Sequence, residues 1–204
     1  RQLCYALAMK SGITLATKVT IVRLMGVPVF ALLLIYYTLG LANGEEVELY
    51  RKWALALFIL VAGTDALDGY LARSRNEITR LGRFLDPLAD KTLLFCGLIL
   101  LTRPNLPHLE PHIPIWFTAL VISRDVFLAL GYMLIHHFAE TVVVQPRIAG
   151  KIATVLQMLV ITWVLFQAPA QYFLWLVTSA ALFTAVAWAF YLADGMRQLN
   201  RAQH

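Results

Sequence analysis

Charged residues are scarce in this chain. Asp, Glu, Lys and Arg make up 14% of its 204 residues, whereas 60% are hydrophobic. About a quarter of an average soluble protein is charged, so this composition excludes an ordinary soluble domain. Six apolar stretches reach the length of about 20 residues that crosses a bilayer, namely Leu24–Ala42, Trp53–Ala72, Leu85–Thr102, Pro114–Leu134, Ile148–Gln167 and Tyr172–Leu192. The sequence therefore predicts an all-α integral membrane protein with a bundle of six transmembrane helices.

The chain also lacks the features of a disulfide scaffold or of a multidomain protein. Its two cysteines, Cys4 and Cys96, cannot define a disulfide framework. No polar tract is long enough for a soluble domain, so residues 1–204 are interpreted as one membrane domain. Before the first span, Leu3 and Leu7 could share the apolar face of an interfacial helix that ends near Lys10.

Basic residues are few on one side of the predicted bundle. The net charge of +5 does not predict a nucleic-acid partner, because in a membrane protein the position of Lys and Arg matters more than their sum. If the N-terminus is cytoplasmic, the connections on the opposite side contain only Arg51, Lys52 and Arg103. This asymmetry predicts that both termini are cytoplasmic, and we expect a bacterial inner membrane.

Four aspartates lie where the second predicted helix ends and the third begins. A carboxylate costs roughly 2.5 to 3.5 kcal/mol to insert at the centre of a membrane helix, so each one needs a function. Asp65 and Asp68 are three residues apart, and Asp86 and Asp90 are four apart. Each pair therefore lies on one helix face, and a short connection brings the two faces together.

Four converging carboxylates would repel one another unless cations neutralised them. Hard divalent cations such as Mg²⁺ or Mn²⁺ prefer oxygen ligands. Two such ions about 3.5 to 4 Å apart suit a displacement at phosphorus, because they stabilise both the attacking and the leaving oxygen. The aspartates therefore predict phosphoryl chemistry with two bound metal ions.

The residues around the aspartates complete a pattern that resembles the signature of the CDP-alcohol phosphotransferase family, D-x2-D-G-x2-A-R-x8-G-x3-D-x3-D. All of its fixed positions are present, and we refer to them as the signature residues: Asp65, Asp68, Gly69, Ala72, Arg73, Gly82, Asp86 and Asp90. The resemblance covers the whole chain, since the family also has a core of six helices.

The resemblance assigns roles to these residues. It implies that Asp65, Asp68 and Asp86 are metal ligands and that Asp90 is both a metal neighbour and the general base. It places Gly69, Ala72, Arg73, Thr79 and Gly82 around the CDP part of the donor. Thr20 matches a second family element before the first span, although Ala16 and Thr17 replace its usual Pro and Asn.

Basic residues in the fourth and fifth predicted helices indicate the acceptor site. The elements S-R-D-V at Ser123–Val126 and G-K-x-x-T-x-x-Q at Gly150–Gln157 resemble the phosphatidylglycerophosphate synthase and eukaryotic-type cardiolipin synthase branches. Arg124, Arg147 and Lys151 are the candidate ligands of an acceptor phosphate. The alternative for Arg124 is a structural ion pair with Asp125, and for the other two it is the charge asymmetry alone.

The resemblance implies transfer of a phosphatidyl group from CDP-diacylglycerol to a phosphate-bearing alcohol, with release of CMP. Glycerol 3-phosphate is the expected acceptor. A cardiolipin synthase that uses phosphatidylglycerol and a phosphatidylinositol phosphate synthase are the alternatives, and a homodimer is compatible with the family. A metal-ion transporter would favour sites near the midplane on broken helices, and a prenyltransferase would lack the G-x-x-A-R element.

Overall fold

The computed structural model describes the backbone of residues 15–45, 47–75, 80–103, 109–138 and 148–202. Side chains are described for residues 25–45, 47–63, 91–103, 109–131, 148–194 and 196. The interfacial helix expected before residue 10 and the site residues Thr79 and Arg147 lie outside the described ranges. The described chain is all-helical, with α2 (Leu15–Asn43), α3 (Glu48–Arg75), α4 (Arg80–Leu101), α5 (Ile115–Phe138), α6 (Ile148–Phe166) and α7 (Ala170–Ala202).

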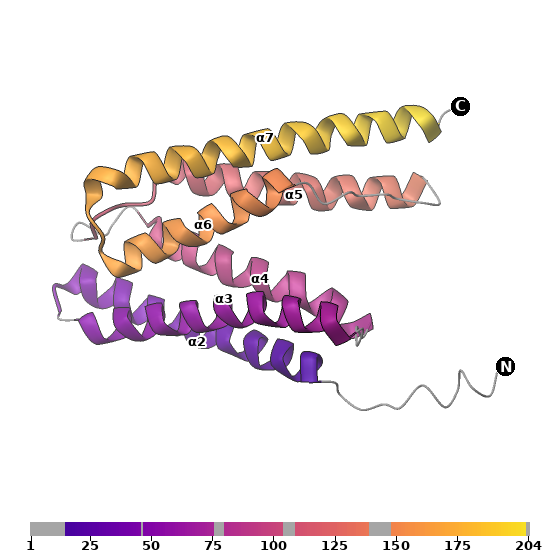
Figure 1. Cartoon of the computed structure of the whole chain (residues 1–204). Coiled ribbons are helices and arrows are strands. Elements are labelled where there is room, and N and C mark those ends of the chain that lie inside the picture. The colour runs from indigo at the N-terminus through magenta and orange to yellow at the C-terminus, as the bar shows by residue number, and fades with distance from the viewer. Residues whose placement is uncertain (1–14, 46, 76–79, 104–108, 139–147, 203–204) are drawn as a thin grey trace.

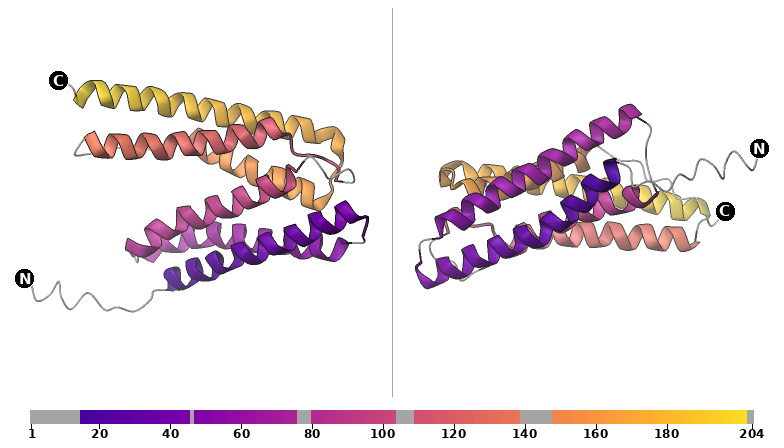
Figure 2. Two further views of the ribbon diagram at one scale, coloured as in Figure 1. Left: turned by 180° about the vertical axis from the view of Figure 1, so that it is seen from behind. Right: turned by 90° about the horizontal axis from the view of Figure 1, so that it is seen from below.

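The helices run alternately up and down the bundle (Figure 1). We call the end where α3 finishes and α4 starts the signature end, and the opposite end the far end. Helices α2, α3 and α4 form one group and α5, α6 and α7 form a second, and α3 and α4 both pack against α6. The two groups lie close together at the far end and diverge toward the signature end (Figures 1 and 2).

Three of the described helices are long and apolar enough to cross a membrane. These spans are Met25–Asn43 in α2, Ile148–Phe166 in α6 and Ala170–Asp194 in α7, and Lys91–Leu101 in α4 is a shorter apolar segment. Five of the helices, all but α6, extend beyond the predicted spans, and the largest extensions are at the start of α2 (Leu15) and at the end of α7 (Ala202). A helix satisfies its own backbone hydrogen bonds, so it can continue beyond the apolar stretch from which its span was predicted.

The surface of the bundle is more apolar than that of a soluble protein. Large side chains such as Leu60, Trp175 and Ile148 are 61%, 77% and 75% exposed. Buried residues meanwhile fill the interior between the groups, including Phe30, Phe58, Leu94, Leu98, Phe117, Val160 and Ile161. Apolar side chains on both the inside and the outside are expected of a protein whose solvent is lipid.

An arginine joins the two groups at the far end. Arg51 of α3 is buried, and its Nη1 donates to the carbonyl oxygen of Leu165, in the last turn of α6. That carbonyl is one of the last four of the helix, which have no partner within it. Nη2 of Arg51 donates to Glu48 at 2.6 Å, and this contact holds the pKa of Glu48 below its usual value. Arg51 therefore caps α6 from the neighbouring group.

Candidate active site

The signature residues lie on the two helices that the sequence indicates. Asp65, Asp68, Gly69, Ala72 and Arg73 are in α3, and Gly82, Asp86 and Asp90 are in α4, while Thr20 is in α2. Their side chains are outside the described ranges. At 1.5 Å per residue, Asp68 lies about 10 Å before the last residue of α3, and Asp86 about 9 Å after the first residue of α4. The two aspartate pairs are thus at similar distances from the connection.

The backbone also limits how far apart the pairs can be. Arg75 ends α3 and Arg80 begins α4, so consecutive Cα atoms 3.8 Å apart allow at most about 19 Å between these two ends. Four carboxylates from two consecutive helices form a donor set of the kind that Mg²⁺ or Mn²⁺ binds. The described side chains contain no group of three or more metal-ligating residues, and the aspartates lie outside that search. The donor set therefore fits the expected metals.

A partly buried ion cluster lies directly beside the last signature residue. Lys91, the residue after Asp90, donates from Nζ to Oδ2 of Asp125 at 2.5 Å. Arg124 donates from Nη1 to the other oxygen, Oδ1, at 2.6 Å. The side chains of Arg124 and Asp125 are only 5% and 9% exposed. Among the described ion pairs, one buried carboxylate of α5 thus accepts hydrogen bonds from two cationic side chains on two helices.

Arg124 has donor capacity that these contacts do not use. Its Nε atom is buried and has no hydrogen-bond partner among the described residues. Its guanidinium carbon lies 5.8 Å from the centre of the Tyr191 ring of α7. A buried N–H group without a partner is costly, and a guanidinium matches phosphate oxygens well. The arrangement suits an anionic ligand at Arg124.

The first turn of α6 faces the same guanidinium. A Cβ atom on Gly150 would lie 3.2 Å from Nη2 of Arg124 and 3.1 Å from the Tyr191 hydroxyl, so glycine permits this close approach. Lys151 follows it and is exposed. The first four N–H groups of a helix lack partners within it and favour anions. Arg124 and the start of α6 therefore lie close together.

The sequence interpretation missed one member of this cluster. It considered Asp125 as a structural partner for Arg124, and that ion pair is present. It assigned no contact to Lys91, although a lysine in an apolar span needs an acidic partner. Asp125, the acidic residue of the next predicted span, was the available signal.

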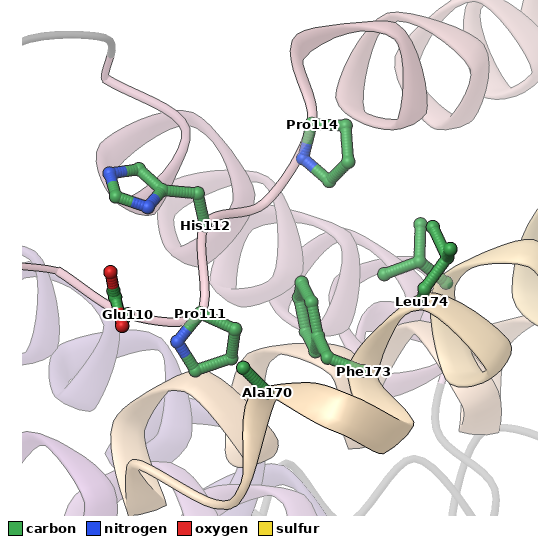
Figure 3. A pocket seen from close by; sticks show the side chains of 8 residues that line it. Glu110, Pro111, His112, Pro114, Ala170, Phe173 and Leu174 are labelled. Atoms are coloured by element: carbon green, nitrogen blue, oxygen red, sulfur yellow. The ribbon is translucent and has the colours of Figure 1, made fainter.

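A pocket among the described residues lies elsewhere. It has a volume of about 360 Å³ and lies at the far end, between Glu110–Pro114 and the first turns of α7. Pro111, Ala170, Phe173 and Leu174 give it an apolar wall (Figure 3). None of the signature residues lines this pocket.

Comparison with known proteins identifies the class. A profile of the CDP-alcohol phosphatidyltransferase family matches residues 13–193. The chain therefore belongs to this family and is a phosphatidyltransferase of phospholipid biosynthesis, as the signature indicated.

Individual relatives within the family are similar over most of the chain. The chain is 35% identical over 152 residues to the CDP-diacylglycerol--glycerol-3-phosphate 3-phosphatidyltransferase of Bacillus subtilis, covering 72% of this chain and 74% of the relative. It is 31% identical over 189 residues to a probable phosphatidylglycerophosphate synthase of Mycobacterium tuberculosis, covering 91% and 83%. It is 30% identical over 180 residues to a cardiolipin synthase (CMP-forming) of Streptomyces coelicolor, covering 87% and 74%.

Proposed function

We propose that this enzyme transfers the phosphatidyl group of CDP-diacylglycerol to glycerol 3-phosphate, forming phosphatidylglycerophosphate and CMP. The observation that carries the proposal is the buried Arg124, whose unpartnered Nε atom lies in a cluster with two cations and one carboxylate. A small dianion needs such a local basic pocket, and an uncharged acceptor does not. The name of the Bacillus subtilis relative supports the same acceptor.

The four aspartates would hold two Mg²⁺ or Mn²⁺ ions. Bound there, the ions would offset the charge of the donor diphosphate and of the departing CMP. Asp65, Asp68 and Asp86 are proposed as ligands, and Asp90 as a neighbour of the metals that also acts as the base. Their spacing on α3 and α4 supports this assignment.

The reaction is one displacement at phosphorus. Asp90 takes the proton of the acceptor hydroxyl, whose oxygen forms a bond to the phosphorus that carries the diacylglycerol. The bond from that phosphorus to the CMP oxygen breaks, and CMP leaves with the electron pair. Gly69, Ala72 and Gly82 leave space for the CDP part of the donor, and Arg73, Thr79 and Thr20 contact it. Holding both substrates in line supplies much of the rate enhancement.

The acceptor phosphate is proposed to bind at Arg124, Arg147 and Lys151. Replacing Arg147 or Lys151 with alanine is expected to raise KM for glycerol 3-phosphate about tenfold, the value of one hydrogen bond to a charged group. KM for CDP-diacylglycerol should change much less. Steady-state kinetics with each substrate varied in turn measures both constants. Lys52→Ala is the matched control, since Lys52 is an exposed lysine of α3 near the far end. Equal changes in both KM values would contradict the assignment.

A second candidate is cardiolipin synthesis from phosphatidylglycerol, favoured by the similarity to the Streptomyces coelicolor protein. Purified enzyme supplied with CDP-diacylglycerol and either acceptor distinguishes the two functions, with CMP release and product mass recorded. Phosphatidylglycerophosphate is the expected product. Cardiolipin from phosphatidylglycerol, without phosphatidylglycerophosphate from glycerol 3-phosphate, would establish the second candidate instead.

We further propose that all six helices span the membrane, with the signature end and both termini in the cytoplasm. The three apolar spans and the bacterial relatives support an inner-membrane protein. The exposed apolar surface would also accommodate a homodimer.

Cysteine labelling tests this orientation. In a variant without Cys4 and Cys96, a single cysteine at Asn76, in the connection after α3, should react with an impermeant thiol reagent only from the cytoplasmic side. A cysteine at Asn43, the exposed last residue of α2, should react only from the opposite side. Labelling in intact cells and in inverted vesicles measures both. The reverse pattern would invert the proposed topology.

A further inference from the structure

Helices α4 and α5 belong to different groups, and the described side chains include two polar contacts between them. Near the far end, the hydroxyls of Thr102, just after α4, and Thr118 of α5 lie 2.7 Å apart. Closer to the signature end, Lys91 of α4 donates to Asp125 of α5 at 2.5 Å. The two helices diverge toward the signature end (Figures 1 and 2). The contact between Lys91 and Asp125 therefore bridges a place where apolar packing between these helices decreases.

The contact between Lys91 and Asp125 links the proposed base to the proposed binding site of the acceptor phosphate. Lys91 is covalently next to Asp90, the proposed base, and Asp125 is next to Arg124, a proposed ligand of the acceptor phosphate. Each oxygen of the Asp125 carboxylate accepts from one of the two cations. The carboxylate thus fixes the orientation of the Arg124 guanidinium and its separation from the helix that carries the base.

We propose that Asp125 is a positioning residue, which sets the acceptor phosphate at the distance from Asp90 at which the acceptor hydroxyl can react. The inference rests on the proposed role of Arg124 in acceptor binding. Asp125 itself is not expected to contact either substrate, because both of its oxygens already accept from Lys91 and Arg124. A misplacement of about 1 Å can reduce a rate a hundredfold, so a half-buried bridge between two diverging helices would affect turnover directly.

If Asp125 acted only through its negative charge, its removal would change KM for the acceptor in the opposite direction. Removing the negative charge of Asp125 leaves two cations near the acceptor phosphate, which by charge alone would tighten binding and lower KM. Loss of positioning leaves the Arg124 guanidinium free to turn and lets Lys91 and Arg124 repel each other, which raises KM. The sign of the change in KM therefore separates the two roles.

The test compares Asp125→Asn, Asp125→Glu and Lys91→Met with the wild-type enzyme in detergent. Asp125→Asn is expected to raise KM for the acceptor about tenfold or more and to lower kcat by about ten- to a hundredfold. KM for CDP-diacylglycerol should stay within about twofold, less than the effect of one hydrogen bond. Asp125→Glu keeps the charge, so its acceptor KM and kcat should both lie between those of Asp125→Asn and those of the wild-type enzyme. Lys91→Met should reproduce part of the defect, and its effect should not add fully to that of Asp125→Asn, since the two residues share one contact.

Thr118→Val is the matched control. It removes the hydroxyl contact of Thr118 with Thr102 near the far end at nearly constant volume, so it should leave both KM values unchanged. Gel filtration and thermal unfolding of each variant show whether the protein is folded. A lower acceptor KM in Asp125→Asn would overturn the inference. So would a loss of folded protein, if KM and kcat were unchanged both in the folded fraction of Asp125→Asn and in Asp125→Glu.

The acceptor used in these measurements keeps this inference distinct from the proposed function. If the wild-type enzyme makes no phosphatidylglycerophosphate, the proposed acceptor is wrong, and the same variants are measured with the acceptor that the enzyme does use. A selective rise in KM for that acceptor would still support the role of Asp125. An unchanged KM, with glycerol 3-phosphate confirmed as the substrate, would refute the inference alone.

Discussion

Asp90→Asn is expected to lower turnover by about 10²- to 10⁴-fold, the range typical of a lost general base. Asparagine keeps the size of the side chain but cannot take the proton of the acceptor hydroxyl. The measurement is kcat from CMP release at saturating substrates and saturating Mg²⁺. Its control is Glu110→Gln, the same change from acid to amide at an exposed residue of the far end.

The metal dependence of this variant separates its two proposed roles. If Asp90 acted only as a metal neighbour, excess Mg²⁺ would restore a large part of the rate. If it is the base, the defect should persist at every metal concentration. Near-normal turnover in Asp90→Asn would show that another group removes the proton.

Removal of divalent cations should abolish activity completely. Without bound metal, the carboxylates of Asp65, Asp68, Asp86 and Asp90 would face the negatively charged diphosphate of the donor with nothing to offset the repulsion. EDTA should therefore stop CMP release, and added Mg²⁺ or Mn²⁺ should restore it.

Two controls accompany the chelation experiment. Adding back Mg²⁺ in stoichiometric excess over EDTA shows that the loss is reversible, and thermal unfolding shows that the protein stays folded. Binding of CDP-diacylglycerol, measured directly, should weaken in parallel with activity. Full activity in excess chelator would mean that the aspartates do not hold a catalytic metal.

The sequence predicted the class and much of the fold because its strongest signals are local. An aspartate in an apolar span is costly wherever the helix packs, so Asp65, Asp68, Asp86 and Asp90 stand out without tertiary information. Helix locations follow from apolar length, and all six predicted spans coincide with helices of the structure. The spacing of the signature also places its two halves on consecutive helices.

The partners of individual polar residues could not be predicted in the same way. Arg51 was identified as a marker of the side opposite the cytoplasm, yet in the structure it caps α6 through Leu165, a contact across 114 positions of the chain. The sequence interpretation assigned Lys91 no role, because the family signature ends at its neighbour Asp90. Both contacts depend on which helices pack together, and hydropathy does not encode that arrangement.

The contact between Arg51 and Leu165 can act as a hinge between the two helix groups. It joins the two groups at the far end. Helix α3 extends about 36 Å from Arg51 to its last residue, Arg75. A rotation of about 5° around this hinge would displace that residue by about 3 Å, enough to separate a reacting oxygen from its phosphorus. Small changes of angle at the far end would thus be amplified where the donor and the acceptor meet.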